Sequence, residues 1–166
     1  MHRLKAGEDN VTLFKAGNKM FLVDKNLEHV KFRVPDYEDI PFIRDIEIKS
    51  FEEPYSEDII AGLISMSRVA IVDSKIVGYV LCLEQDDSLF IVRLAVHQNF
   101  RDRGIARLLL HVTRLAFEER FQYLNAWVLD SQEDALRLFA SSEFKITEVK
   151  KNFEANETGY LYQRIL

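Results

Sequence analysis

The chain of 166 residues contains one cysteine, six glycines and three prolines. Because a disulfide needs two thiols and a zinc cluster needs several, the lone Cys82 excludes an internal disulfide and any cysteine-based zinc site. Glycine and proline are too rare for a low-complexity chain, and the sequence has no internal repeats. No apolar run approaches the roughly 20 residues that span a bilayer, so no transmembrane helix is predicted.

Positive charge is also scarce. The 27 aspartates and glutamates outnumber the 22 lysines and arginines, which leaves a net charge of −5. Since a phosphate backbone is bound by a basic face, this balance argues against a general nucleic-acid binder. Residues 1–10 are polar and lack an apolar segment, so no signal peptide is predicted. We therefore expect a cytoplasmic protein without nucleic-acid or membrane partners and without a metal.

Hydrophobic residues make up 48% of the chain, which is enough for the buried core of one domain. Residues 16–19 separate two short apolar segments, a pattern that predicts a β-hairpin over residues 11–23. A polar stretch then precedes a strand-like segment that begins at Val30. We therefore predict an N-terminal extension (1–29) and one domain (30–166). Two roles fit the extension: to cover a sheet edge or to form a homodimer contact.

Hydrophobic periodicity predicts an α+β domain of about seven strands with helices inserted between them. Three of these strands, within residues 68–96, are joined by short turns, which indicates an antiparallel meander. The expected strands are 30–34, 68–72, 76–83, 89–96, 123–129, 144–153 and 160–165, and the expected helices are 40–51, 59–66, 104–116 and 131–142.

The junction between the strand ending at Val96 and the helix opened by Gly104 has an unusual composition. It carries three arginines in an acidic chain: Arg101, Arg103 and Arg107. Free N–H groups at a helix N-terminus favour an anion, and the small residues Gly104 and Ala106 let a phosphate approach the backbone. The loop therefore predicts a phosphate site, with a solvated helix start bearing incidental arginines as the alternative. Neither nucleotide-binding glycine pattern is present.

Residues 101–106 match the pyrophosphate loop Q/R-x-x-G-x-G/A at every specified position. Together with the order of the elements around this loop, they make residues 30–166 resemble the GNAT superfamily of acyl-CoA-dependent N-acyltransferases. The likeness is closest to the branch that acetylates protein N-termini, including ribosomal-protein alanine acetyltransferases, because residues 75–81 and 146–149 are similar to that branch. It implies a mixed, mostly antiparallel sheet with helices on both faces.

The resemblance also implies acetyl-CoA as co-substrate and direct attack of an amine on its thioester. Strand backbone at 94–96 would pair with the pantetheine, and an N–H there would stabilise the oxyanion. The implied cofactor-binding residues are Leu94, Ala95, Val96, Arg101, Asp102, Arg103, Gly104, Ile105, Ala106, Arg107, Gln132 and Phe139. Direct transfer needs no enzyme nucleophile, so Cys82 is interpreted as a small core residue.

Several positions depart from the family. Phe139 stands where these enzymes carry the tyrosine that protonates the departing thiolate, and Trp127 stands where the ribosomal-protein branch has a glutamate base. Gln132 replaces an asparagine that contacts CoA, and Phe153–Glu154 replaces a tyrosine pair that holds the substrate N-terminus. The usual general acid and several usual bases are therefore absent.

One pair retains the family spacing. Glu53 and Tyr55 match a glutamate and tyrosine of the substrate loop, and a carboxylate there could accept a proton from the incoming ammonium. These two are the candidate catalytic residues, with an exposed acidic loop as the alternative. Glu84 and His97 are weaker candidates.

Three functions stay open from the sequence. The first is an N-acetyltransferase acting on a primary amine: a protein or peptide N-terminus, a lysine or a small amine. The second is a catalytically weakened acyl-CoA-binding module that serves as a sensor or partner-binding subunit. The third is an interaction domain whose arginine loop binds another phosphate ligand.

Overall fold

The computed structural model describes residues 11–16, 19–24 and 29–166. The strands are β1 (Val11–Ala16), β2 (Lys19–Asp24), β3 (Val30–Arg33), β4 (Arg68–Val72), β5 (Lys75–Gln85), β6 (Ser88–Val96), β7 (Tyr123–Leu129), β8 (Lys145–Glu154) and β9 (Glu157–Ile165). The helices are α1 (Ile40–Ser50), α2 (Glu57–Leu63), α3 (Ile105–Phe117) and α4 (Glu133–Ala140), with single 3₁₀ turns η1 (Tyr37–Asp39), η2 (Ile64–Met66) and η3 (Gln98–Phe100).

Seven strands form one sheet in the order β3-β4-β5-β6-β7-β9-β8. Every neighbouring pair in this sheet is antiparallel except β6 and β7, which run parallel. The predicted α+β class and the mostly antiparallel sheet are therefore confirmed. None of the helices in the described part of the chain is long and apolar enough to cross a membrane.

Strand β5 separates two hydrophobic cores because successive side chains of a strand point to opposite faces. Val80 and Cys82 belong to the core under α3 and α4, whereas Tyr79 and Leu81 belong to the core under α1 and α2. The prediction of helices on both faces is confirmed.

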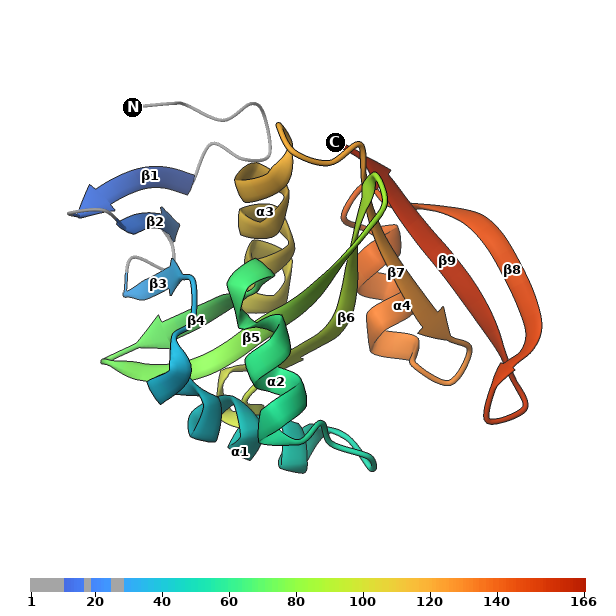
Figure 1. The fold of residues 1–166 in the computed structure, drawn as a ribbon, viewed down its shortest axis with the longest axis horizontal. Coiled ribbons are helices and arrows are strands. Elements are labelled where there is room, and N and C mark those ends of the chain that lie inside the picture. Colours follow the sequence, from blue (N-terminus) through green and yellow to red (C-terminus); the bar gives the residue numbers. More distant parts are fainter. Residues whose placement is uncertain (1–10, 17–18, 25–28) are drawn as a thin grey trace.

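The sheet opens between its two central strands. The register of β6 with β7 runs from Ser88 opposite Tyr123 to Phe90 opposite Asn125, and ends there. Figure 1 shows the two strands side by side at one end and diverging toward the other, so that β7, β9 and β8 turn away from the rest of the sheet. Backbone groups of β6 after Phe90 are therefore left for another partner on that side.

Strands β1 and β2 pair antiparallel as a separate two-stranded sheet, with Val11 opposite Asp24 and Ala16 opposite Lys19. The turn of the predicted hairpin, residues 17–18, lies outside the described residues, as do residues 1–10. The boundary at residue 29 and the two roles considered for the extension stay predictions.

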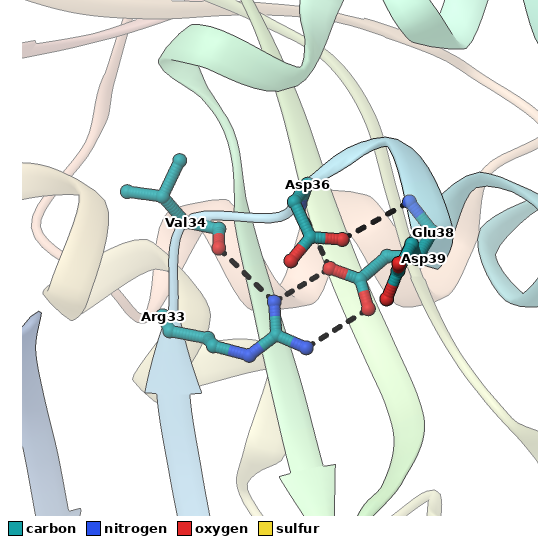
Figure 2. A network of polar contacts seen from close by, with 5 residues as sticks. All are labelled: Arg33, Val34, Asp36, Glu38 and Asp39. Carbon is teal, nitrogen blue, oxygen red and sulfur yellow. Dashed lines mark hydrogen bonds and ion pairs between the residues drawn. The ribbon is translucent and has the colours of Figure 1, made fainter.

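A buried charge pair fixes the passage from β3 into α1 (Figure 2). The Arg33 guanidinium donates to both carboxylate oxygens of Asp39, at 2.5 and 2.8 Å, and to the Val34 carbonyl at 3.1 Å. Asp39 also accepts from the Asp36 N–H at 2.8 Å, and the Asp36 side chain accepts from Glu38 N–H at 3.0 Å. The hydrogen bond to Asp39 raises the pKa of Arg33 above its ordinary value. The pair therefore sets the direction in which α1 leaves the sheet.

We expect Asp39→Asn to lower the free energy of unfolding by about 2 kcal/mol, because it leaves a largely buried guanidinium without its charged partner. Urea unfolding followed by circular dichroism measures this change. The exposed pair of Lys49 and Asp45, 2.9 Å apart, provides the control. Asp45→Asn should change stability by less than about 0.5 kcal/mol, and an equal effect of the two variants would contradict the assignment.

Candidate functional site

A cavity of about 1290 Å³ occupies the opening between β6 and β7. Its wall also includes the start of α3, much of the segment from the end of β7 into α4, and part of the loop between α1 and α2. The residues predicted from the sequence that line it are Glu53, Tyr55, Leu94, Ala95, Val96, Arg101, Asp102, Gly104, Ala106, Arg107, Gln132 and Phe139. Arg103 and Ile105 are not part of the wall.

Strand β6 contains a β-bulge next to the cavity. Leu81 of β5 pairs with Arg93 and Cys82 pairs with Ile91, so that Val92 is an extra residue in β6. In a regular strand, residues 91 and 93 would lie on the same face. The bulge instead leaves Ile91 in the α3/α4 core and turns Arg93 to the α1 side, where it reaches Glu47. The bulge thereby gives the cavity wall a cationic side chain.

The N-terminus of α3 opens onto the cavity. Gly104 precedes the helix with a φ of 86°, a left-handed conformation that a residue with a Cβ adopts only with strain. An added Cβ at Gly104 would have no neighbour within 4 Å, so open space lies beside this backbone. The Leu108 N–H bonds the Gly104 carbonyl at 3.1 Å, and the N–H groups of the first turn before it have no partner within the helix. The free N–H groups at this end of α3 can therefore donate hydrogen bonds to an anion.

The three arginines of this loop do different things. Arg101 donates from Nε to the Val96 carbonyl at 2.9 Å and remains in the cavity wall. Arg107 donates to both the carbonyl and the hydroxyl of Ser141, at 2.8 Å each, and ties α3 to the end of α4. Arg103 lies over the Phe100 ring at 5.2 Å and does not line the cavity. Arg101 is therefore the arginine best placed for a phosphate group.

Gln132 and Phe139 bring α4 to the cavity. The Gln132 side-chain oxygen accepts from the Leu129 N–H at 2.8 Å, which closes the turn between β7 and α4. Phe139 is 4% exposed and packs edge-on against Phe144 at 5.0 Å and beside Tyr162 at 5.8 Å. Its ring offers an apolar wall without a proton donor.

Two stacked aromatic rings form another part of the cavity wall. Trp127 of β7 stacks on Phe153 of β8 with 4.4 Å between ring centroids and 19° between planes. The Lys150 ammonium lies 5.0 Å from the Trp127 ring centroid. Phe153 lies directly over Gly159, where a Cβ would come within 2.7 Å of the ring. The absence of a side chain at 159 therefore makes room for the stack.

Glu53 and Tyr55 lie in the loop between α1 and α2, here called the α1–α2 loop (residues 51–56). This loop faces β6. Arg93 donates to the Glu53 carbonyl at 3.1 Å, and its guanidinium lies over the Phe51 ring at 4.4 Å and over the Tyr55 ring at 4.0 Å. The Glu53 side chain is exposed at the rim of the cavity. The structure thus brings both candidate residues to the same cavity as Trp127 and Phe153.

Glu47, Tyr79 and Arg93 were missed in the sequence. Glu47 is fully buried, with 0% exposure, and bonds the Tyr79 hydroxyl, the Tyr55 N–H and Arg93. A signal for Glu47 was available, because it follows Ile40 and Ile43 at helical spacing and so puts an acid on the apolar face of α1. Arg93 gave no such signal, since its direction depends on the bulge.

The two weaker candidates, His97 and Glu84, and the lone cysteine lie outside the cavity wall. His97 accepts the Asn99 N–H at 3.1 Å and caps η3, and Glu84 is paired with Arg120 at 2.8 Å. Neither lines the cavity. Cys82 is 1% exposed in the α3/α4 core, and burial raises the pKa of its thiol to about 12. These positions agree with a loop residue, a surface ion pair and a core residue.

The model of the acetyltransferase (GNAT) family matches residues 33–144 of the chain. Among solved structures, the fold is similar to the ribosomal-protein-S18-alanine N-acetyltransferase from Escherichia coli, with a TM-score of 0.72 and 19% identity over 82% of this chain and 93% of that one. It is also similar to Ard1 from Thermoplasma volcanium, with a TM-score of 0.75 and 22% identity over 83% and 98% of the two chains.

A third similar structure is NAA60 from Arabidopsis thaliana in complex with a bisubstrate analogue, with a TM-score of 0.73 and 17% identity over 82% of this chain and 97% of that one. A comparison with curated protein sequences finds no match. At these identities the solved structures support the fold, while the family model supports membership.

We expect the Cys82 thiol to resist alkylation in the folded protein. With a pKa of about 12, the buried thiol is almost entirely protonated at pH 8, whereas an unfolded cysteine has a pKa of about 8.5. Iodoacetamide at pH 8, followed by mass spectrometry, should modify the native chain at least about 100-fold more slowly than the chain in urea. Rapid labelling of the native chain would show that Cys82 is accessible.

Proposed function

Because the chain belongs to the acetyltransferase (GNAT) family, we propose that it transfers an acetyl group from acetyl-CoA to a primary amine. The acceptor is the N-terminus of a protein or peptide, a lysine or a small amine. The observation that carries this proposal is the opened sheet: β6 leaves β7 at Phe90 and leads directly to the N-terminus of α3.

The binding of the co-substrate is supported by three features along that path. Backbone groups of Leu94–Val96 lie at the open edge of β6 and can pair with the amides of a pantetheine as an added strand does. The free N–H groups after Gly104 and the Arg101 guanidinium suit a pyrophosphate. The cavity volume of about 1290 Å³ is large enough for CoA with room for an acceptor.

In the proposed reaction, acetyl-CoA supplies an activated acyl group as a thioester. The neutral amine nitrogen attacks the carbonyl carbon, and the carbon–sulfur bond then breaks, which leaves an amide and the CoA thiolate. One proton leaves the ammonium before attack, a second leaves the nitrogen during transfer, and the thiolate takes up one proton. A β6 N–H near Leu94–Ala95 would stabilise the oxyanion of the tetrahedral intermediate.

We propose Glu53 as the group that accepts a proton from the incoming ammonium, directly or through water, and Tyr55 as its neighbour in the acceptor site. Both lie in the α1–α2 loop and line the cavity. The acidic residues of this loop and the net charge of −5 favour a cationic acceptor. Phe153 and Trp127 would pack against the apolar part of that acceptor.

A second function is favoured by Phe139. Its ring lacks the hydroxyl that protonates the thiolate in related enzymes, and it is packed against Phe144 and Tyr162. A chain that binds acyl-CoA and turns it over slowly or not at all would act as a sensor or as a partner-binding subunit.

We expect acetyl-CoA and CoA, but not ATP, to bind in the cavity. Trp127 is the only tryptophan of the chain and lines this cavity, so its fluorescence should change with acetyl-CoA. Gly104→Ala should weaken acetyl-CoA binding about tenfold, because alanine at a φ of 86° strains the anion-binding backbone by about 1–2 kcal/mol.

Gly62→Ala is the matched control for Gly104→Ala. Gly62 lies in α2, where an added Cβ has no neighbour within 4 Å, and this change should leave the affinity unaltered. No fluorescence change and no thermal stabilisation with either CoA species would contradict the proposed function. An equal response to ATP would support the third function considered from the sequence.

We expect Glu53→Gln to lower kcat/KM for the amine by about 100-fold, since removal of one general base costs about 10²–10⁴ in rate. Thiol release from acetyl-CoA over a panel of peptides and small amines measures this change. The neighbouring Glu52 is exposed and does not line the cavity, so Glu52→Gln is the control and should stay near wild type. Tight acetyl-CoA binding with every acceptor inert would favour the sensor.

A further inference from the structure

A fully buried carboxylate lies behind the candidate acceptor site and takes no part in the mechanism above. Glu47 projects from the last turn of α1 with 0% exposure. Burying an ionised carboxylate costs several kcal/mol unless hydrogen bonds and an opposite charge offset the lost hydration. Its partners therefore indicate what this residue holds in place.

The two oxygens of Glu47 face different parts of the molecule. Oε1 accepts a hydrogen bond from the Tyr79 hydroxyl of β5 at 2.6 Å and lies 3.4 Å from Arg93 Nε of β6. Oε2 accepts the Tyr55 N–H of the α1–α2 loop at 2.8 Å. One carboxylate thus joins the sheet to the loop.

Arg93 makes a second connection to the same loop. Its guanidinium donates to the Glu53 carbonyl at 3.1 Å and lies between the Phe51 and Tyr55 rings, at 4.4 and 4.0 Å. The far side of the loop is held as well, because Arg44 donates to the Tyr55 carbonyl. The backbone from the Glu53 carbonyl to the Tyr55 carbonyl is therefore fixed by groups that start from α1 and β6.

Tyr79, the partner of Glu47 on β5, remains a hydrogen-bond donor. Burial, together with the hydrogen bond to Glu47, raises the pKa of Tyr79 far above its ordinary value. The Tyr79 hydroxyl is therefore protonated at every working pH, and Glu47 keeps a fixed hydrogen-bond partner on β5 as well as the one on the loop.

We propose that Glu47 is a positioning residue that holds the α1–α2 loop against β6 and thereby sets the affinity for the acceptor amine. This inference rests on the proposed function for the acceptor, whereas the control of loop conformation does not. If Glu47 served stability alone, it would have little advantage, because apolar residues of similar volume often stabilise a core as well as a buried ion pair or better. Outside α1, Glu47 contacts Tyr55 and Arg93, which line the cavity, and Tyr79, which joins it to β5.

The first test is hydrogen exchange of the α1–α2 loop by mass spectrometry, which needs no substrate. Glu47→Gln keeps the shape but loses the charge that attracts Arg93, and we expect exchange in peptides covering residues 51–58 to rise at least about tenfold. Ser67→Ala is the matched control. It removes a buried hydroxyl, in a residue with 0% exposure, that donates to the Leu63 carbonyl and accepts from the Cys82 N–H, neither of which belongs to the loop.

The second test separates acceptor from co-substrate. We expect Glu47→Gln to raise KM for the amine about tenfold, while the Kd for acetyl-CoA from Trp127 fluorescence changes less than about twofold. Tyr79→Phe removes the hydrogen bond to β5 and leaves the contacts of Glu47 with Tyr55 and Arg93, so the KM of this variant should change less than that of Glu47→Gln at a comparable loss of thermal stability.

Arg93→Lys serves if Glu47→Gln does not fold, because lysine keeps the charge opposite Glu47 but cannot also span to the Glu53 carbonyl and both rings. Hydrogen exchange of the α1–α2 loop should rise in Arg93→Lys as it does in Glu47→Gln. Unchanged exchange of the loop in the folded variants, or an equal rise in KM in Ser67→Ala, would overturn the inference. If the wild-type chain acetylates no amine, the proposed function fails, and the exchange data still decide whether Glu47 holds the loop.

Discussion

The end of the pairing between β6 and β7 at Phe90 and Asn125 is the constraint on which the candidate site depends. A parallel pair that continued to Val96 would satisfy the backbone of β6 and close the space beside it. Because the strands diverge instead, the backbone of β6, the N-terminus of α3 and the start of α4 meet around one cavity. The two cores allow this opening, since α1 with α2 and α3 with α4 stabilise the sheet from opposite faces.

The part of the cavity wall formed by the α1–α2 loop depends on a largely buried ion pair. Arg93 carries a positive charge to the cavity wall with 23% of its side chain exposed, and Glu47 balances it from a fully buried position. Each of these groups would be costly alone, so the pair and the loop it contacts form one unit. The bulge at Val92 is essential to this unit because it turns Arg93 toward α1.

The sequence predicted those parts that depend on local pattern. The short turns within residues 68–96 predicted the meander, and the short match at 101–106 predicted the helix start at which Gly104 precedes α3. The sequence did not predict features that depend on contacts between residues far apart in the chain. The bond of Arg107 to Ser141 joins residues 34 positions apart, so the three arginines could not be told apart beforehand. The stacking of Trp127 on Phe153 likewise depends on the order β7-β9-β8, which no local periodicity encodes.

Gly159 has a consequence beyond its own strand. Phe153 occupies the space that a Cβ at 159 would need, with contacts of 2.7 Å to the ring and 2.9 Å to the Phe153 Cβ. A single methyl group on β9 would therefore force Phe153 to shift relative to Trp127 and change the shape of the cavity that both rings line. Gly159 itself does not line the cavity. The shape of this part of the cavity can thus evolve, or be engineered, through a residue that does not line it.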